Sequence, residues 1–253
     1  MSSPSNLLFD LYFTRPAMRA IFCDSGRLQG MLDFEAALAR AEASTGLIPA
    51  EVLSPIVAAC NADLYDPAEL AHAIVSAGNS AIPLVKALGK RVAALSPDAE
   101  RYVHYGATSQ DVMDSGLVLQ LRAAVEVLES DLADLANALA TQAECHTDTP
   151  MIGRTWLQQA TPVTLGMKLA GMLGVVTRHR QRLEQLKPRL LVLQFGGASG
   201  TLAALGEQAW PVSEALAREL GLNLPEQPWH TLDRRQPGQA GPGLEFDDAD
   251  RGR

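Results

Sequence analysis

The stretch from Leu117 to Thr149 constrains the fold most, because it contains neither proline nor glycine. Its apolar residues recur at steps of four and three, which is the heptad pattern of a helix with one apolar seam. The members of this seam are Leu117, Leu121, Val125, Leu128, Leu132, Leu135 and Leu139. A helix of about 28 residues would be roughly 42 Å long, and it would need partner helices to cover its seam.

A second seam of the same period follows, with His179 in one of its slots. Its apolar members are Leu165, Leu169, Met172, Val176, Leu183 and Leu186. We expect Pro162 in the first turn of this helix and Pro188 at its end, because proline lacks the N–H that a helix interior needs. Residues 207–220 predict a further, shorter helix. Two long helices of matching period favour a bundle, and no alternating β-branched run competes, so the sequence predicts an all-α fold.

These signals divide the chain into three regions. Residues 1–100 predict an N-terminal domain of short helices, because prolines interrupt the sequence repeatedly. Residues 101–232 predict part of a central helical bundle. Residues 233–253 are rich in Gly, Pro, Asp and Arg, so we expect a disordered or non-native tail. A bundle with two long helices leaves its seam uncovered, so we expect that other chains cover it or that part of the protein is missing.

Composition excludes several classes of function. The net charge is −8, from 21 Lys+Arg against 29 Asp+Glu, which argues against a nucleic acid or an anionic membrane as a partner. No run approaches about 18 consecutive apolar residues, and the N-terminus lacks the basic start of a signal peptide. We therefore expect no membrane span and a cytoplasmic location. The three cysteines are scattered, which favours neither a disulfide framework nor a metal site.

A polar segment from Arg101 to Asp111 stands directly before the first long helix. Thr108, Ser109 and Asp111 are good N-cap residues, so the segment fits a well-capped helix start. It fits equally an anion site, because hydroxyls and free amides at a helix N-terminus bind carboxylate or phosphate. His104 and Arg101 would add a titratable group and a fixed positive charge to such a site.

A second polar segment, 149–162, lies between the two long helices and predicts a shaped loop or a bent helix entry. Arg154 and Thr155 offer a carboxylate-binding pair, and Trp156 offers an apolar wall with one N–H donor. A surface arginine beside a core tryptophan would give the same pattern. His146 follows the first long helix, where it could reach this end of the bundle or favour the helix dipole as an exposed histidine.

The third segment, Gln194 to Thr201, has three glycines, which allow the backbone to approach a ligand or another helix closely. It lacks the dinucleotide-binding pattern. His230 lies in a compact polar and aromatic turn that ends at Thr231. The sequence has no metal-ligand set, no nucleophile elbow and no phosphate loop. The residues alone therefore favour binding of a polyanionic small molecule, with proton transfer as the chemistry.

Two of these segments carry a family resemblance. The run from His104 to Asp111 is similar to the first motif of the fumarase/aspartase superfamily, and the run from Gly153 to Gln158 is similar to the second. Most lyases of that superfamily carry histidine where this chain has Trp156. Tryptophan there, together with the upstream run from Ala77 to Lys86, resembles the cycloisomerase branch, which is related to adenylosuccinate lyase.

The resemblance implies a cofactor-free enzyme without a metal, a homotetramer whose active sites are built from several subunits. The implied reaction is the cyclisation of 3-carboxy-cis,cis-muconate, a small polycarboxylate, to a carboxymuconolactone in protocatechuate breakdown by the β-ketoadipate pathway. The implied catalytic residues are His104, Ser109 and His146. The implied substrate-binding residues are Arg101, Thr108, Arg154, Thr155, Trp156, Gln194, His230 and Thr231.

The chain departs from the superfamily after Thr231, where a mobile Gly-Ser-Ser loop that supplies the proposed base should follow. We therefore expect an incomplete chain that has little activity alone. Two alternatives remain open. Trp156 argues against an adenylosuccinate-lyase-like enzyme, whereas the missing serine loop and the uncovered seam favour a non-catalytic helical module for oligomerisation.

Overall fold

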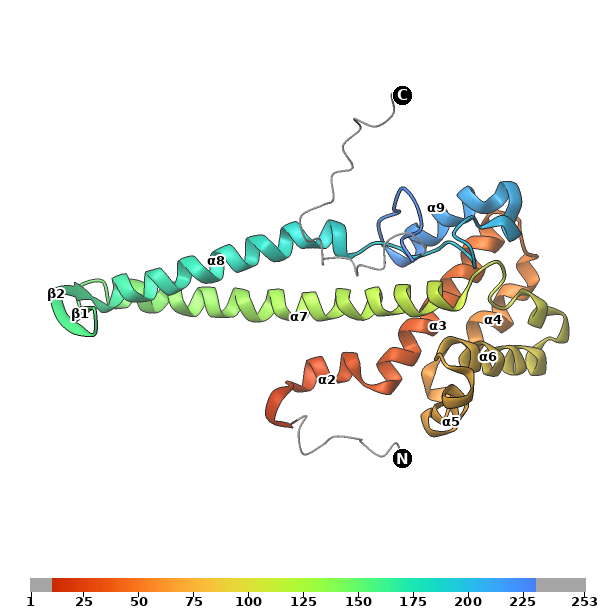
Figure 1. Cartoon of the computed structure of the whole chain (residues 1–253), viewed down its shortest axis with the longest axis horizontal. Helices are drawn as coiled ribbons and strands as arrows, with labels where there is room; N and C mark the ends of the chain where they lie inside the picture. The colour runs from red at the N-terminus through yellow and green to blue at the C-terminus, as the bar shows by residue number, and fades with distance from the viewer. Residues whose placement is uncertain (1–10, 231–253) are drawn as a thin grey trace, which may run out of the picture.

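The computed structural model describes residues 11–230 and consists of a helical head from which a long two-helix arm extends (Figure 1). The head contains helices α3 (Asp24–Ser44) to α6 (Ala81–Leu95) and α9 (Ala209–Leu220). The arm contains α7 (Ser109–Cys145), α8 (Leu165–Leu190) and a small β-hairpin at its far end. The predicted all-α fold is confirmed, and the hairpin is the one addition to it. The expectations for Thr231 and for residues 233–253 lie outside the described residues.

Prolines and small polar residues delimit the helices of the head, as the sequence predicts. Pro67 starts α5, where Asp66 caps the first turn by accepting from the N–H of Ala68 at 2.9 Å. The α-helices are α2 (Pro16–Phe22), α3 (Asp24–Ser44), α4 (Leu53–Ala59), α5 (Pro67–Ala77), α6 (Ala81–Leu95) and α9 (Ala209–Leu220). Short 3-10 turns are η1 (Ala50–Val52), η2 (Ala62–Leu64), η3 (Pro97–Tyr102) and η4 (Ala203–Gln208).

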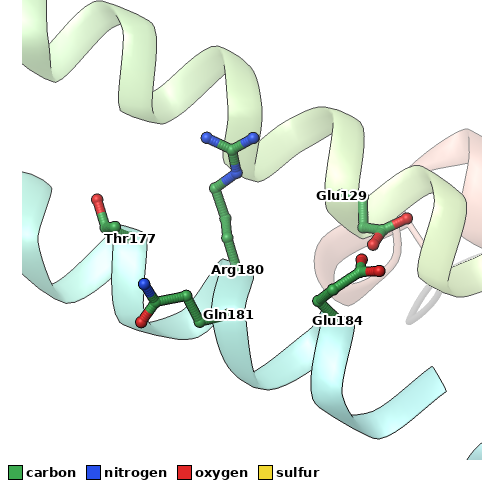
Figure 2. A pocket seen from close by; sticks show the side chains of 5 residues that line it. All are labelled: Glu129, Thr177, Arg180, Gln181 and Glu184. Carbon is green, nitrogen blue, oxygen red and sulfur yellow. The ribbon is translucent and has the colours of Figure 1, made fainter. Parts of the chain in front are cut away.

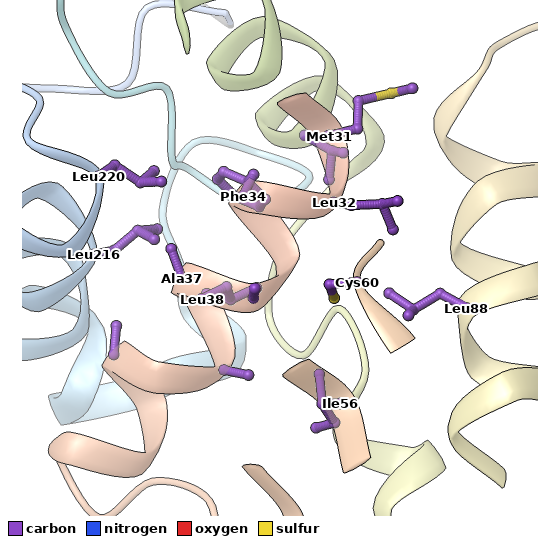
Figure 3. Close-up of a cluster of buried hydrophobic side chains, with 14 of the residues drawn as sticks. Met31, Leu32, Phe34, Ala37, Leu38, Ile56, Cys60, Leu88, Leu216 and Leu220 are labelled. Carbon is purple, nitrogen blue, oxygen red and sulfur yellow. The ribbon is translucent and has the colours of Figure 1, made fainter. Parts of the chain in front are cut away.

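Helix α3 lies at the centre of the hydrophobic core (Figure 3). Its Leu32 and Phe34 are 0% exposed, and they pack among apolar side chains of α4, α6 and α9. Gly30 of α3 meets Gly116 of α7, and a Cβ at Gly30 would lie 2.7 Å from the carbonyl oxygen of Gly116. This close approach anchors the arm to the head. The core cluster takes residues from both sides of residue 100, and the predicted division there stays a prediction.

The arm consists of two antiparallel helices, α7 (Ser109–Cys145) and α8 (Leu165–Leu190), joined by strands β1 (Pro150–Thr155) and β2 (Gln158–Thr164). The prediction of two long helices is confirmed, although α7 begins earlier than the seam indicated. Its 37 residues give a length of roughly 55 Å at 1.5 Å per residue. The arm therefore carries its far end well away from the head.

The segment between the two long helices is a β-hairpin, so the expected loop or bent helix entry is wrong. Trp156 and Leu157 form its turn with φ of 51° and 61°, the left-handed values that a tight hairpin turn requires. Pro162 pairs with Ile152 in β2 and is therefore not in the first turn of α8. A two-stranded sheet tolerates it because each strand has a free edge.

Pro188 lies inside α8 instead of ending it, so this expectation is also wrong. Proline removes a single N–H donor, and the helix ends two residues later at Leu190, so the lost interior bonding is small. The N–H of Leu191 closes the helix by donating to the carbonyl of Lys187 at 2.9 Å.

Parts of both predicted seams remain exposed along the arm. The exposed fraction is 42% at Leu128, 47% at Leu135 and 48% at Met172. His179, which occupies a seam slot, is exposed and lies 3.2 Å from a guanidinium nitrogen of Arg182. Within residues 11–230, no helix combines the length and the apolar character that crossing a bilayer would take.

Candidate functional site

Asp111 joins two polar segments of the chain at the start of α7. Its side chain is fully buried, and its carboxylate accepts four hydrogen bonds from N–H groups. The donors to Oδ1 are Nε2 of Gln194 at 2.9 Å and the backbone of Gly196 at 3.0 Å. The donors to Oδ2 are the backbones of Thr108 at 3.0 Å and Gly197 at 2.9 Å. The helix start is thereby joined to the third polar segment.

Burial raises the pKa of the Asp111 carboxyl above its ordinary value, and its four N–H donors counteract that rise. The same region holds Asp114, whose pKa burial also raises, while its hydrogen bond from Gln110 acts in the opposite direction. A hydrogen bond of 2.7 Å joins Nε2 of Gln110 to Asp114 Oδ1. The start of α7 is therefore rich in carboxyl groups.

Gln194 is completely buried and uses its whole side-chain amide within the protein. Besides donating to Asp111, its Nε2 lies 2.6 Å from Nδ1 of His230. Its Oε1 accepts from the N–H of Trp229 at 3.0 Å and of His230 at 3.1 Å. Ser115 Oγ fixes its backbone by donating to the carbonyl at 2.7 Å and accepting from the N–H at 3.0 Å. Gln194 thus holds the third segment against His230.

The glycines after Gln194 serve close packing, which is one of the two readings that the sequence left open. A Cβ at Gly196 would lie 2.6 Å from the ring of Pro228 and 3.1 Å from Cε1 of His230. Gly197 has φ +67°, a left-handed value that disfavours a side chain. Gly196 therefore allows the segment around His230 to pack closely on the third polar segment, and Gly197 allows the turn that follows.

His104 lies at the same end of α7, in a left-handed backbone conformation with φ 58°. Its Nδ1 is 2.6 Å from Oε1 of Glu35, whose side chain is 1% exposed. Burial alone would lower the pKa of His104, but the carboxylate of Glu35, its hydrogen bond and the charge of Asp111 outweigh burial and raise it. The carboxylate of Glu35 therefore favours the protonated form of His104 next to the helix start.

Thr108 is the N-cap of α7 and Ser109 is its first residue, as the sequence predicts. Both are half-buried, and the Ser109 hydroxyl makes no hydrogen bond within the described part of the chain. This hydroxyl and the first-turn amides form the kind of group that binds a carboxylate. Arg101 lies nearby in η3, exposed, with its guanidinium 4.9 Å above the ring of Tyr102.

The other predicted site residues lie at the opposite end of the arm. Arg154, Thr155 and Trp156 form the exposed tip of the hairpin, where Trp156 is 95% exposed. His146 caps the C-terminal end of α7 and its Nδ1 lies 3.1 Å from Oγ1 of Thr149. The full length of α7 separates this tip group from the helix-start group of Ser109, so one chain alone does not bring the two groups together.

A groove of about 400 Å³ lies between the two helices of the arm (Figure 2). Glu129, Thr177, Arg180, Gln181 and Glu184 line it. Its two carboxylates meet Lys187, at 2.9 Å from Glu129 and 2.6 Å from Glu184. The groove therefore has no surplus positive charge with which to hold a polyanion. Among residues 11–230, no group of three or more His, Cys, Asp or Glu side chains is placed to hold a metal ion.

A sequence profile described as lyase matches residues 11–235, which is most of the chain. The chain belongs to this lyase family. It is 74% identical over 228 residues to a 3-carboxy-cis,cis-muconate cycloisomerase of Pseudomonas aeruginosa, covering 90% of this chain and 50% of that relative. It is 67% identical over 227 residues to the enzyme of that name from Pseudomonas putida, covering 90% of this chain and 54% of that relative.

A solved structure of the lyase family supports the same relationship. The crystal structure of 3-carboxy-cis,cis-muconate lactonizing enzyme from Pseudomonas putida matches with a TM-score of 0.87 and 70% sequence identity, covering 90% of this chain and 52% of that chain. The resemblance to the cycloisomerase branch is thereby confirmed. The chain spans about half the length of the curated relatives it matches.

Sequence reasoning missed three residues of this candidate site: Asp111, Ser115 and Glu35. Asp111 follows the N-cap by three residues, so the capping pattern marked it, but only as a helix start. Ser115 and Glu35 carry no local signal, because their partners are 79 and 69 residues away in the sequence. The available signal was that Ser115 and Glu35 are polar residues on otherwise apolar helix faces, where a buried polar side chain needs a hydrogen-bond partner.

Proposed function

We propose that this chain contributes the first substrate-binding segments of a cofactor-free cycloisomerase that converts 3-carboxy-cis,cis-muconate to a carboxymuconolactone in the protocatechuate branch of the β-ketoadipate pathway. The observation that carries the proposal is the 74% identity over 228 residues to a relative with that name. The arrangement at the start of α7 supports it, since a cation, a free hydroxyl and helix amides suit a substrate with several carboxylates.

We infer that the working unit is a homotetramer. Support comes from the exposed apolar residues along the arm and from the tip, where Trp156 and Leu157 are 95% and 106% exposed. An exposed apolar patch of this kind is typical of an interface. If a second arm packs antiparallel to the first, its tip reaches the head of the first chain, because two copies of one chain have arms of equal length. The two groups of site residues then form one site.

Charge gives a physical reason for such sharing. The helix start holds the carboxyls of Glu35, Asp111 and Asp114 against the imidazoles of His104 and His230. A tricarboxylate needs more positive charge than this group supplies. Arg154 at the tip of a second copy supplies a guanidinium, which binds carboxylate through two parallel hydrogen bonds.

The reaction needs a carboxylate oxygen of the substrate to add to a double bond while a proton is delivered to the carbon beside another carboxylate. We assign carboxylate binding to Thr108, Ser109 and the first-turn amides, and electrostatic stabilisation of the enolate-like intermediate to His104 and Arg154. Oriented binding of both reacting ends in one site lowers the entropic part of the barrier. Trp156 forms an apolar wall that excludes water, and His146 of the tip group stays our candidate proton donor.

The remaining assignments follow from the same proposal. Arg101, Thr155 and Thr231 complete the substrate contacts, and Gln194 and His230 act at the helix start. We propose a cytoplasmic enzyme that binds no nucleic acid, in keeping with the net charge of −8. We also keep the division into an N-terminal helical domain, 1–100, and a bundle region, 101–232. A non-catalytic oligomerisation module is the second candidate, because the exposed seam would serve it equally well.

Subunit mixing tests the proposal directly. Ser109→Ala and Arg154→Ala each remove one group, so neither variant alone should bind 3-carboxy-cis,cis-muconate in calorimetric titrations. Unfolded and refolded together, they should regain binding, because some mixed sites receive Ser109 from one chain and Arg154 from the other. A matched mixture of Arg154→Ala with Thr155→Ala should regain none, since both changes lie in the same tip.

The outcomes separate the candidates. Binding of 3-carboxy-cis,cis-muconate by the unmodified chain supports the cycloisomerase, and binding of adenylosuccinate instead would support the adenylosuccinate-lyase-like alternative. Assembly without any binding at millimolar ligand would support the oligomerisation module. A chain that stays monomeric, or mixed variants that regain no binding, would refute the shared site.

A further inference from the structure

The hydrogen bonds around Gln194 determine which end of its amide is the oxygen. Two backbone N–H groups, of Trp229 and His230, point at one side-chain atom at 3.0 and 3.1 Å. Backbone N–H groups can only donate, so this atom must be the acceptor, Oε1. The other end is therefore Nε2, which donates.

Both hydrogens of that Nε2 have an acceptor. One points to Oδ1 of Asp111 at 2.9 Å, and the other to Nδ1 of His230 at 2.6 Å. Asp111 cannot release its share by turning, because three backbone N–H groups hold its two oxygens in place. The amide of Gln194 is thus fixed in one orientation in a fully buried position.

An amide N–H directed at a ring nitrogen requires a lone pair there. The neutral imidazole of His230 then carries its hydrogen on the other nitrogen, Nε2. We propose that Gln194 is a positioning residue that holds His230 as the neutral Nε2–H tautomer, so that the ring offers a hydrogen-bond donor to an oxygen of the bound ligand. The identity of that ligand oxygen rests on the proposed function, whereas the tautomer does not.

The second histidine at this site has the opposite partner. Nδ1 of His104 faces the carboxylate of Glu35 and therefore carries a hydrogen. Asp111 is linked to His230 through Gln194, whose Nε2 contacts both side chains. The direct bond from Gln194 opposes protonation at Nδ1, since a protonated Nδ1 would meet an N–H. The two imidazoles thus have opposite partners at Nδ1, a carboxylate for His104 and an amide N–H for His230.

The tautomer can be read from the ring-nitrogen chemical shifts of the ¹⁵N-histidine-labelled full chain in mildly alkaline buffer, without any ligand. His230→Gln identifies the signals by their loss. We expect Nδ1 of His230 at the downfield position of a nitrogen with a lone pair and Nε2 at the upfield position of a protonated nitrogen. A hydrogen on Nδ1 of His230 in the unmodified chain, or equal population of both tautomers, would overturn the proposal regardless of the results with the variants.

Gln194→Glu then tests the cause. A glutamate places an acceptor where the N–H was, so His230 should shift its hydrogen to Nδ1 or become doubly protonated. Gln181→Glu, an added charge on the exposed side of α8, should leave the pattern unchanged. An unchanged pattern in a folded Gln194→Glu chain would remove Gln194 from the proposal. Because these spectra need no substrate, they can fail while the binding and mixing experiments succeed, and the reverse also holds.

Discussion

Replacing the buried Glu42 of α3 should change how the stability of this protein depends on pH. Its side chain is 0% exposed, and neither carboxyl oxygen has a hydrogen-bond partner in the described part of the chain. Burial, helped by the nearby charge of Glu35, raises the pKa of Glu42 from 4.5 to about 9. Near neutral pH the folded chain therefore keeps a proton that the unfolded chain has released.

The size of the effect follows from proton linkage. Between pH 4.5 and about 9 the folded state binds one more proton at Glu42 than the unfolded state does, so stability falls as pH rises. The loss is a little over 1 kcal/mol per pH unit, which gives about 3 kcal/mol between pH 6 and pH 8. Glu42→Gln keeps the neutral shape of the protonated carboxyl and should remove this contribution.

Urea unfolding followed by circular dichroism at pH 6, 7 and 8 measures the slope. The unmodified chain should lose about 3 kcal/mol more over this range than Glu42→Gln does, whatever the other groups contribute to both. Glu69→Gln, at an exposed position on α5, is the matched control and should keep the steep slope. Equal slopes for the unmodified chain and Glu42→Gln would refute the reasoning from burial.

Other expectations follow from single contacts. Asp111→Asn turns an NH2 group toward two of the four N–H donors, so the free energy of unfolding should fall by about 3–5 kcal/mol in urea titrations. Glu35→Gln should lower the pKa of His104 in an NMR titration, because the burial that disfavours its charge remains while the carboxylate is gone; an unshifted titration would contradict this. Gly30→Ala should cost about 2 kcal/mol by overpacking against α7, whereas Gly171→Ala, with open space around it, should gain up to about 1 kcal/mol in the same thermal melts.

The long helices could be predicted because their seams repeat every seven residues and no proline interrupts α7. The seam alone does not locate the start of α7, since Val112 near the start is buried in the head and falls outside the heptad pattern. A residue buried by a distant element carries no periodic signal of its own. The seam therefore predicts the helix type, and the capping residues Thr108 and Asp111 predict where the helix begins.

The hairpin could not be predicted for a different reason. Tight hairpin turns usually show Asn-Gly or a similar pair, and this turn uses Trp156 and Leu157 at φ of 51° and 61°. Both residues disfavour that conformation and both are exposed, so local propensity and burial within the chain point away from the observed structure. A two-stranded sheet is also marginal on its own. Contact with another chain would compensate both the strained turn and the marginal sheet. A single sequence does not show such a contact.

The site illustrates the same limit at larger scale. Motif chemistry identified the helix-start group and the tip group, but spacing along the sequence gave no measure of their separation in space. Roughly 55 Å of continuous helix lies between Ser109 and Cys145, and a straight helix cannot fold back on itself to close that gap. The feature that most constrains the fold therefore also excludes a site made of both groups within one copy. Any chemistry that needs Ser109 and Arg154 together must take them from different chains, so the concentration dependence of ligand binding reports directly on assembly.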